Sequence, residues 1–186
     1  MKFTETKLKG CFILEPTVFE DERGYFFEAF NDQKFEQIIG SKSIFVQDNQ
    51  SQSQYGVVRG LHMQTGEHGQ AKLVRVLEGR VLDVAVDVRP GSATYGQYVE
   101  VELSAINKRQ LYVPRGFLHG FSVLSENAVF FYKCDNHYHK VAEDGVHPLD
   151  RELGIDWQIP REEMILSVKD EEAQSFMVFK EKNGIG

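Results

Sequence analysis

The sequence predicts an all-β protein, a sandwich or barrel of short strands with short helices only at its margins. Three observations indicate this fold class. The middle of the chain is rich in β-branched residues, its apolar runs are short and separated by Gly and Pro, and 14 Phe and 7 Tyr provide the large side chains that packed sheets bury. A ligand of such a fold would occupy the mouth of the barrel.

The first elements follow from local patterns. A helix is expected over residues 32–39, because Asn31 can cap its N-terminus and Gly40 can end it. The β-branched runs 73–77 and 81–88 are separated by a Glu-Gly turn, which predicts a hairpin.

The remaining elements are expected in the second half of the chain. In the strand over 99–103, apolar residues alternate with Glu100 and Glu102, which indicates one solvated face. A second helix is expected after Pro160. Further strands are expected at 110–113, 120–124 and 129–133.

Length and composition limit the class of protein. The chain of 186 residues fits one domain, expected to span residues 1–186. No run approaches the about 18 apolar residues of a membrane span, and the N-terminal residues do not resemble a signal peptide. The two cysteines, Cys11 and Cys134, are far apart and form no C-x-x-C motif. We therefore expect a cytoplasmic protein without membrane contact.

The net charge of −7 argues against a nucleic acid as partner, since phosphate-backbone binding needs clustered Lys and Arg. An anionic small molecule would need cations that converge only in the fold. The candidates are Arg23, Arg59, Lys72, Arg75 and Lys169.

Two segments carry histidines of possible functional importance. Arg59 and His62 lie three residues apart, but an isolated histidine is more often a strand-end residue bound to backbone. Residues 111–121 contain Pro-x-Gly-x-x-His-x-Phe, with the histidine at His119. This spacing resembles the second cupin motif, in which a Pro-Gly turn directs the histidine into the barrel. The resemblance implies a cupin-type double-stranded β-helix (jelly-roll) barrel; the alternative is a tight turn before a core histidine.

The residues do not favour a metal site. Metal-binding cupins usually present His-x-His with a nearby acidic residue and a later histidine, whereas this chain has His62-x-Gln64. His68 lies in a turn-like stretch and is expected on a solvated loop. We expect neither a metal ion nor another cofactor.

Six blocks resemble dTDP-4-dehydrorhamnose 3,5-epimerases in order and spacing over nearly the whole chain. They are RGYFFE (23–28), QDNQS (47–51), RGLH (59–62), QAKLVR (70–75), SAINKRQ (104–110) and LGIDW (153–157). The resemblance implies epimerisation at C3 and C5 of a dTDP-linked 4-keto-6-deoxy sugar. Departures are Met63 in place of an aromatic residue, His137 in place of Tyr, and prolines missing after Tyr138 and after Asp170; they concern fine specificity more than reaction type.

The resemblance also implies catalytic roles. The C4 ketone acidifies the protons on C3 and C5, so inversion needs a base on one face and a proton donor on the other. His62 matches the base, held by Asp170, which could instead be a helix N-cap. Tyr132 matches the proton donor, with a core aromatic as the alternative. Lys72 matches a cation for the enolate oxygen, with a solvated strand-end lysine as the alternative.

Substrate contacts are implied in the same way. Arg59 and Lys169 resemble diphosphate or nucleoside contacts. Phe26 and Tyr138 could stack on thymine. The family forms homodimers with exchanged N-terminal strands, so Arg23, Phe26 and Glu28 would serve the neighbouring site. The other nucleotide and sugar contacts would be Gln47, Asn49, His119, Tyr138 and Glu143.

Other functions stay open at this stage. A related enzyme could epimerise only C3 or only C5, or act as a ketoisomerase. A non-catalytic nucleotide-sugar-binding cupin and a metal-dependent cupin oxygenase or isomerase are further alternatives. The presence of both His62 and Tyr132 favours the double epimerase.

Overall fold

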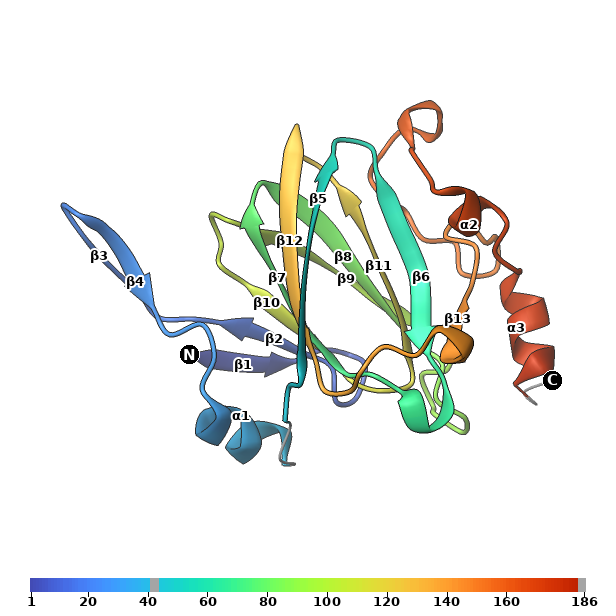
Figure 1. The fold of residues 1–186 in the computed structure, drawn as a ribbon, viewed down its shortest axis with the longest axis horizontal. Helices are drawn as coiled ribbons and strands as arrows, with labels where there is room; N and C mark the ends of the chain where they lie inside the picture. The colour runs from blue at the N-terminus through green and yellow to red at the C-terminus, as the bar shows by residue number, and fades with distance from the viewer. Residues whose placement is uncertain (41–43, 184–186) are drawn as a thin grey trace.

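The computed structural model describes residues 1–40 and 44–183. Two β-sheets face each other, with a hairpin projecting at one side and the short C-terminal helices at the other (Figure 1). The larger sheet contains β1 (Lys2–Glu5), β2 (Phe12–Glu15), β10 (Gln110–Val113), β7 (Lys72–Glu78), β12 (Asn127–Cys134) and β5 (Gln47–Gln54), in that order. The smaller contains β13 (Glu143–Gly145), β6 (Val58–Gln64), β11 (Phe117–Val123), β8 (Arg80–Asp87) and β9 (Tyr98–Ser104). The all-β prediction is confirmed.

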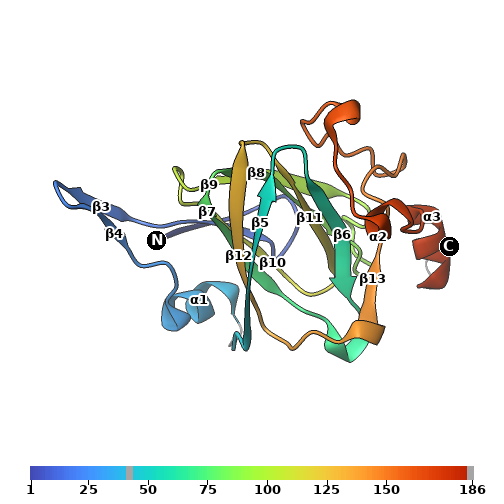
Figure 2. The same ribbon diagram turned by 45° about the horizontal axis from the view of Figure 1, so that its top comes forward.

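The main core lies between the two sheets. Phe130 of β12 stacks on Phe121 of β11, with 4.2 Å between the ring centroids, so that rings from opposite sheets meet directly. The alternation predicted for β9 is present, because Val99, Val101 and Leu103 are buried whereas the intervening glutamates are exposed. Seen from a second direction, the sheets enclose a barrel (Figure 2).

The C-terminal segment covers the outer face of the smaller sheet. Trp157 is fully buried there, and its indole N–H donates to the carbonyl of Pro148 at 2.8 Å. Phe176 and Phe179 belong to the same apolar cluster. This segment forms η3 (Arg161–Glu163), α2 (Val168–Glu171) and α3 (Phe176–Lys182). Because it covers one face and the core covers the other, β8 is an apolar run instead of an alternating one.

The first predicted helix is confirmed. α1 spans Asp32–Ile39, with the Asn31 side chain accepting from the backbone N–H of Lys34 and Gly40 in the left-handed region at φ 77°. Helical structure also follows Pro160, as expected, but in separate short pieces. The single 3-10 turn η3 comes first, and the α-helices α2 and α3 form further along the chain.

The predicted hairpin over residues 73–88 is also wrong. β7 pairs with β10 and β12, whereas β8 pairs with β11 and β9, so the two strands belong to different sheets. The chain crosses between the sheets at Gly79, whose φ is 75°. A Cβ there would collide with the carbonyl oxygen of Asn127. A glycine with positive φ suits a hairpin turn and a corner equally well, and the local sequence does not distinguish them.

The remaining elements are a projecting arm and short turns around the barrel. The arm is the hairpin of β3 (Val18–Asp21) and β4 (Gly24–Phe27), which extends away from both sheets (Figure 1). Its side chains Phe19, Tyr25 and Phe26 are 63%, 58% and 70% exposed. The turns are η1 (Gly66–His68) and η2 (Lys140–Ala142). Among the described residues, no helix has the length and apolar character needed to cross a membrane.

Candidate active site

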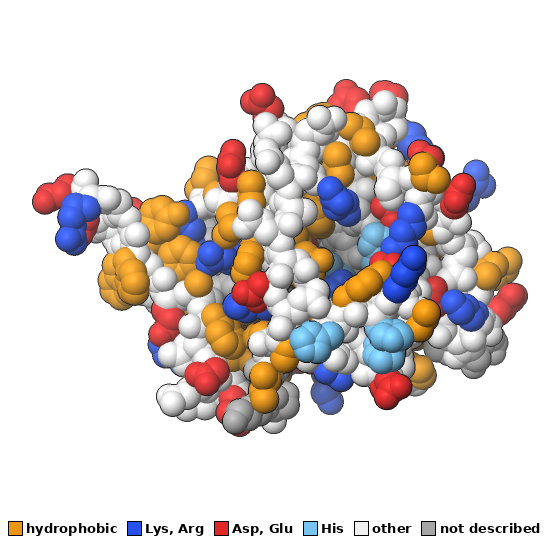
Figure 3. Space-filling model, viewed as in Figure 1, with side chains coloured by type: hydrophobic (Ala, Val, Ile, Leu, Met, Phe, Trp, Pro, Cys, Tyr) orange, Lys and Arg blue, Asp and Glu red, His pale blue; other side chains and the backbone are white. Residues whose placement is uncertain are grey.

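A cavity of about 640 Å³ opens between the two sheets. Figure 3 shows the hollow, with cationic side chains and histidines gathered at it. A smaller depression of about 280 Å³ adjoins it and shares four lining residues, Asn49, His62, Lys72 and Tyr132. The cavity brings together most of the predicted site residues, namely Asn49, Arg59, His62, Lys72, His119, Tyr132, Lys169 and Asp170. The depression adds Gln47, Tyr138 and Glu143.

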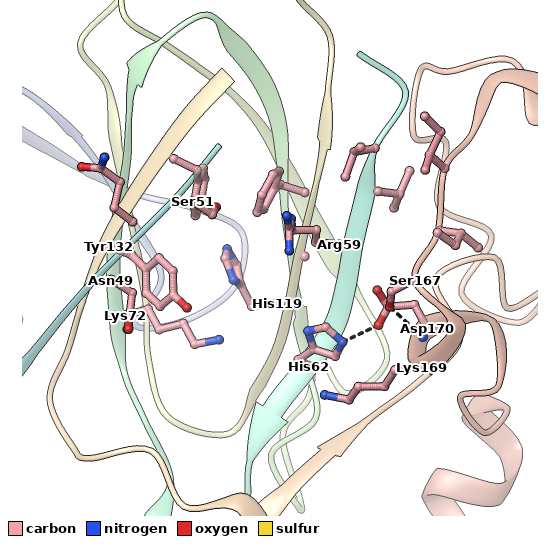
Figure 4. A pocket seen from close by; sticks show the side chains of 18 residues that line it. Asn49, Ser51, Arg59, His62, Lys72, His119, Tyr132, Ser167, Lys169 and Asp170 are labelled. Atoms are coloured by element: carbon pink, nitrogen blue, oxygen red, sulfur yellow. Dashed lines mark hydrogen bonds and ion pairs between the residues drawn. The ribbon is translucent and has the colours of Figure 1, made fainter. Parts of the chain in front are cut away.

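His62 and Asp170 form a close pair on one side of the cavity (Figure 4). Nε2 of His62, on β6, lies 2.5 Å from Oδ1 of Asp170, on α2. Asp170 is 3% exposed. Burial raises the pKa of its carboxyl group, but the hydrogen bond from His62 and the charge of His62 outweigh burial and leave this pKa below its usual value. The carboxylate therefore stays ionised and can hold the Nε2–H of the imidazole.

The alternative that Asp170 caps α2 is wrong. Ser167 is the N-cap, and its hydroxyl accepts from the backbone N–H of Asp170 at 3.2 Å. Asp170 is thus the third residue of the helix, where its side chain is free to reach His62. The short helix places a carboxylate beside a strand more than one hundred residues earlier in the chain.

Tyr132 and Lys72 come from the opposite sheet. The Lys72 ammonium lies 5.9 Å from the centre of the Tyr132 ring, and both side chains line the cavity. Burial raises the pKa of the Tyr132 phenol, so the phenol keeps its proton at neutral pH. Burial lowers the pKa of Lys72, with Cys134, Asp83 and Glu143 opposing it. Lys72 is therefore not the solvated strand-end residue of the alternative interpretation.

Further cations and their partners lie at the rim. The Arg59 Nε–H donates to the Ser53 hydroxyl at 3.0 Å, which fixes the guanidinium against β5. The Lys169 ammonium lies 2.6 Å from a carboxylate oxygen of Glu143. The Tyr138 hydroxyl donates to the same carboxylate at 3.1 Å, so Glu143 is shared between Lys169 and Tyr138.

The arm residues do not reach the cavity of their own chain. Arg23 pairs with Asp21 at 2.6 Å, Phe26 is largely exposed, and Glu28 pairs with Lys34 at 2.7 Å. The structure therefore does not bring these three predicted contacts together with the others within one chain.

One charged group beneath the cavity escaped the sequence interpretation. Asp83 is fully buried, and its two carboxylate oxygens lie 3.0 and 3.1 Å from Nε2 of His119. The signal in the sequence is an acidic residue in the middle of an otherwise apolar strand.

The site offers acid–base groups. Within the described parts of the chain, no group of three or more His, Cys, Asp or Glu side chains is placed to hold a metal ion. His68 does not lie on a fully solvated loop tip, because its ring stacks on that of His139 with 4.0 Å between the centroids.

Comparison with known proteins identifies the family. A family model described as dTDP-4-dehydrorhamnose 3,5-epimerase matches residues 5–177. The chain belongs to this family. A curated family enzyme from Salmonella typhimurium is 53% identical over 169 residues, covering 89% of this chain and 90% of its own length.

Solved structures of epimerases agree with this placement. That of the Elizabethkingia anophelis enzyme has a TM-score of 0.93 and 61% identity, covering 96% of this chain and 97% of its own. That of a Legionella pneumophila enzyme in complex with dTDP-4-keto-L-rhamnose has a TM-score of 0.92 and 46% identity, covering 97% and 95%. The predicted cupin-type barrel and the predicted epimerase family are both confirmed.

Proposed function

We propose that the cavity is the active site in which this epimerase inverts C3 and C5 of dTDP-4-dehydro-6-deoxy-D-glucose, giving dTDP-4-dehydro-6-deoxy-L-mannose. The assignment of the site depends on one observation. An imidazole held by a buried carboxylate faces a protonated phenol across a single cavity, with the two groups on opposite sheets. Inversion at a carbon next to a ketone needs this arrangement, because the proton must leave one face and return to the other.

His62 acts as the base. Its Nε2–H donates to Asp170, so Nδ1 carries the lone pair that takes a proton from C3 or C5. The electrons of the broken C–H bond move to the C4 oxygen, giving an enolate. Lys72 stabilises this oxygen, since a fixed cation contributes most where charge develops. Tyr132 then protonates the same carbon from the opposite face, and solvent resets both residues.

The nucleotide is held at the rim. Arg59 and Lys169 bind the diphosphate, with Gln47, Asn49, His119 and Glu143 contacting sugar and nucleoside and Tyr138 stacking on thymine. Lys169 is paired with Glu143 in the structure, and Glu143 has its pKa lowered because this cation outweighs the effect of burial. A bound diphosphate would therefore pair with Lys169 alongside the carboxylate of Glu143.

The second part of the proposal is a homodimer with exchanged N-terminal strands. The exposed aromatic side chains of the arm support it, and so does Arg75 on the outer face of the larger sheet. Nε and Nη1 of Arg75 are buried without a hydrogen-bond partner among the described residues, and Phe27 and Phe131 lie beside the guanidinium. An acceptor supplied by a second copy would satisfy these donors. Arg23, Phe26 and Glu28 would then complete the partner's site.

Mixing two inactive variants tests the exchange. In a heterodimer of Arg23→Ala and His62→Asn subunits, one site receives an intact cavity from the first subunit and an intact arm from the second. We expect the mixture to regain activity after subunit exchange. A mixture that forms dimers but stays inactive would contradict the shared site.

The compartment is also part of the proposal. Cys11 and Cys134 are both free thiols in the structure and both are buried, which suits a reducing cytoplasm. Burial raises the pKa of Cys134 to about 11, so this thiol beside the cavity stays protonated and unreactive.

Deuterium exchange from solvent separates the base from the donor. With dTDP-4-keto-6-deoxyglucose in D2O, His62→Asn should lose both inversion and exchange at C3 and C5, by roughly a hundredfold or more. Tyr132→Phe keeps the base, so exchange at one carbon at least should outlast inversion. Binding of dTDP should change little in either variant.

Two control variants lie outside the cavity. His137→Asn alters an exposed imidazole, and Tyr95→Phe removes a phenol hydroxyl that has no hydrogen-bond partner among the described residues. Both should behave as the wild type. If His62→Asn exchanges at the wild-type rate while binding dTDP normally, His62 is not the base. Exchange at only one carbon in the wild type would indicate a mono-epimerase.

A further inference from the structure

A second His–Asp pair lies in the same cavity, and the reaction as described above gives its carboxylate no role. In the smaller sheet β11 runs between β6 and β8. His119 is directly opposite His62 on one side and Ala85 on the other. Asp83 is two residues from Ala85 along β8, so it projects from the same face as His119 and meets it diagonally. The strand register thus directs both histidines toward the cavity (Figure 4), and it places Asp83 on the same face of the sheet.

Burial of the Asp83 carboxylate at this position is energetically unfavourable. Asp83 is fully buried, and within the described parts of the chain its side-chain hydrogen bonds go only to Nε2 of His119. Burial raises the pKa of Asp83, and the charges of His119 and Lys72 act against burial. An isolated buried carboxylate destabilises a fold unless it is paired, so its environment here is built around those two side chains.

Asp87 on the same strand shows what a structural aspartate looks like. It is equally buried, and it accepts hydrogen bonds from Arg89 at 2.6 Å, Ser92 at 2.7 Å and Thr94 at 2.6 Å, which fix the loop after β8. These partners lie in the adjoining loop. The partner of Asp83, by contrast, lines the cavity.

We propose that Asp83 is a positioning residue for the epimerisation: it holds the ring of His119 as the Nε2–H tautomer, with Nδ1 left for the substrate. This inference rests on the proposed assignment of the cavity as the active site. His119 then contacts the sugar in one fixed orientation.

Asp83→Asn tests the proposal in the full-length enzyme. We expect kcat to fall about tenfold to a hundredfold, the range typical for losing a group that orients another, with the dTDP dissociation constant changed by less than about twofold. Exchange at C3 and C5 should fall in parallel with inversion, because a sugar that His119 no longer orients is misplaced relative to His62 before the enolate forms.

Asp87→Asn is the matched control. It removes a buried carboxylate from the same strand, so it should lower the thermal unfolding midpoint but leave kcat unchanged. If Asp83→Asn also keeps the wild-type kcat, or if Asp87→Asn reproduces its loss, the positioning role is refuted.

A measurement on the unsubstituted enzyme keeps the proposal testable if Asp83→Asn does not fold. The 15N shifts of the His119 ring should show Nε2 protonated; a ring protonated only at Nδ1 would overturn the proposal. His62→Asn, assayed alongside, separates the two levels of inference. Retained exchange in His62→Asn refutes the assignment of the cavity and the role of Asp83 together, whereas lost exchange with an unchanged Asp83→Asn refutes the role of Asp83 alone.

Discussion

Replacing Asp170 by Asn tests whether the carboxylate beside His62 works in catalysis. The bond spans 2.5 Å and the carboxylate is 3% exposed, so it is a strong charge-assisted hydrogen bond, worth about 1.5–3 kcal/mol. Because about 1.4 kcal/mol corresponds to a tenfold change in rate, loss of this hydrogen bond alone would lower kcat about tenfold to a hundredfold. An asparagine amide can also donate to Nε2 and move the ring proton to Nδ1, which blocks the base. An inverted tautomer of this kind can cost up to about ten-thousandfold in another enzyme.

We therefore expect kcat of Asp170→Asn to fall by about a hundredfold to ten-thousandfold. Solvent deuterium exchange at C3 and C5 should fall with it, whereas dTDP binding by calorimetry should stay within about threefold. Asp150→Asn is the control, because Asp150 does not line the cavity and accepts from the backbone N–H of Phe176, the first residue of α3, at 3.0 Å. A kcat for Asp170→Asn within about threefold of wild type, in a folded enzyme, would refute the proposed role of the pair.

Three further outcomes are expected. Arg59→Ala should raise the dTDP dissociation constant about tenfold to a hundredfold. Arg115→Ala, which breaks a surface pair with Asp135, should leave this constant unchanged. If titration with dTDP shows wild-type affinity for Arg59→Ala, Arg59 does not bind the nucleotide. Activity should survive exhaustive chelation, because the chemistry needs only acid–base groups; loss that a divalent metal restores would contradict this. The pKa of Asp87 is lowered to about 2 because its hydrogen bonds to Arg89, Ser92 and Thr94 outweigh burial. Its contribution of about 2 kcal/mol to the free energy of unfolding is therefore present above about pH 4 and lost as the pH falls to about 2, so the stability difference between wild type and Asp87→Asn should shrink over that range.

The sequence predicted correctly those helices and strands whose structure depends on neighbouring residues. The ends of α1 followed from Asn31 and Gly40, since capping depends on neighbouring residues only. The strand β9 followed from alternation, since one of its faces is solvated. The hairpin around Gly79 failed because pairing depends on distant strands: β7 and β8 are separated by one residue in sequence but have no common neighbour in either sheet.

In the site, too, some features could be predicted from the sequence and others depend on contacts between distant strands. The structure brings His62, Lys72 and Tyr132, which the family resemblance had pointed to, to one cavity, although neither their burial nor their mutual distances can be derived from spacing. The contact between Asp83 and His119 could not be predicted, because it runs diagonally from β8 to β11 and so requires the strand register. The arm residues were expected to serve a second chain, and a single chain leaves them away from the cavity.

The proposed division of the chemistry between two sheets explains why a barrel suits this reaction. His62 belongs to the smaller sheet and Tyr132 to the larger, so the proposed base and the proposed donor face each other only when the sheets are held at a fixed separation. Phe130 helps to set that separation, because it stacks on Phe121 across the core and lies 6.0 Å from Tyr132 and 6.2 Å from His119 between ring centroids. A misplacement of about 1 Å in a reacting group can cost about a hundredfold in rate. The packed aromatic core under the cavity therefore acts as the rigid support that keeps abstraction and return of the proton on opposite faces of the same sugar.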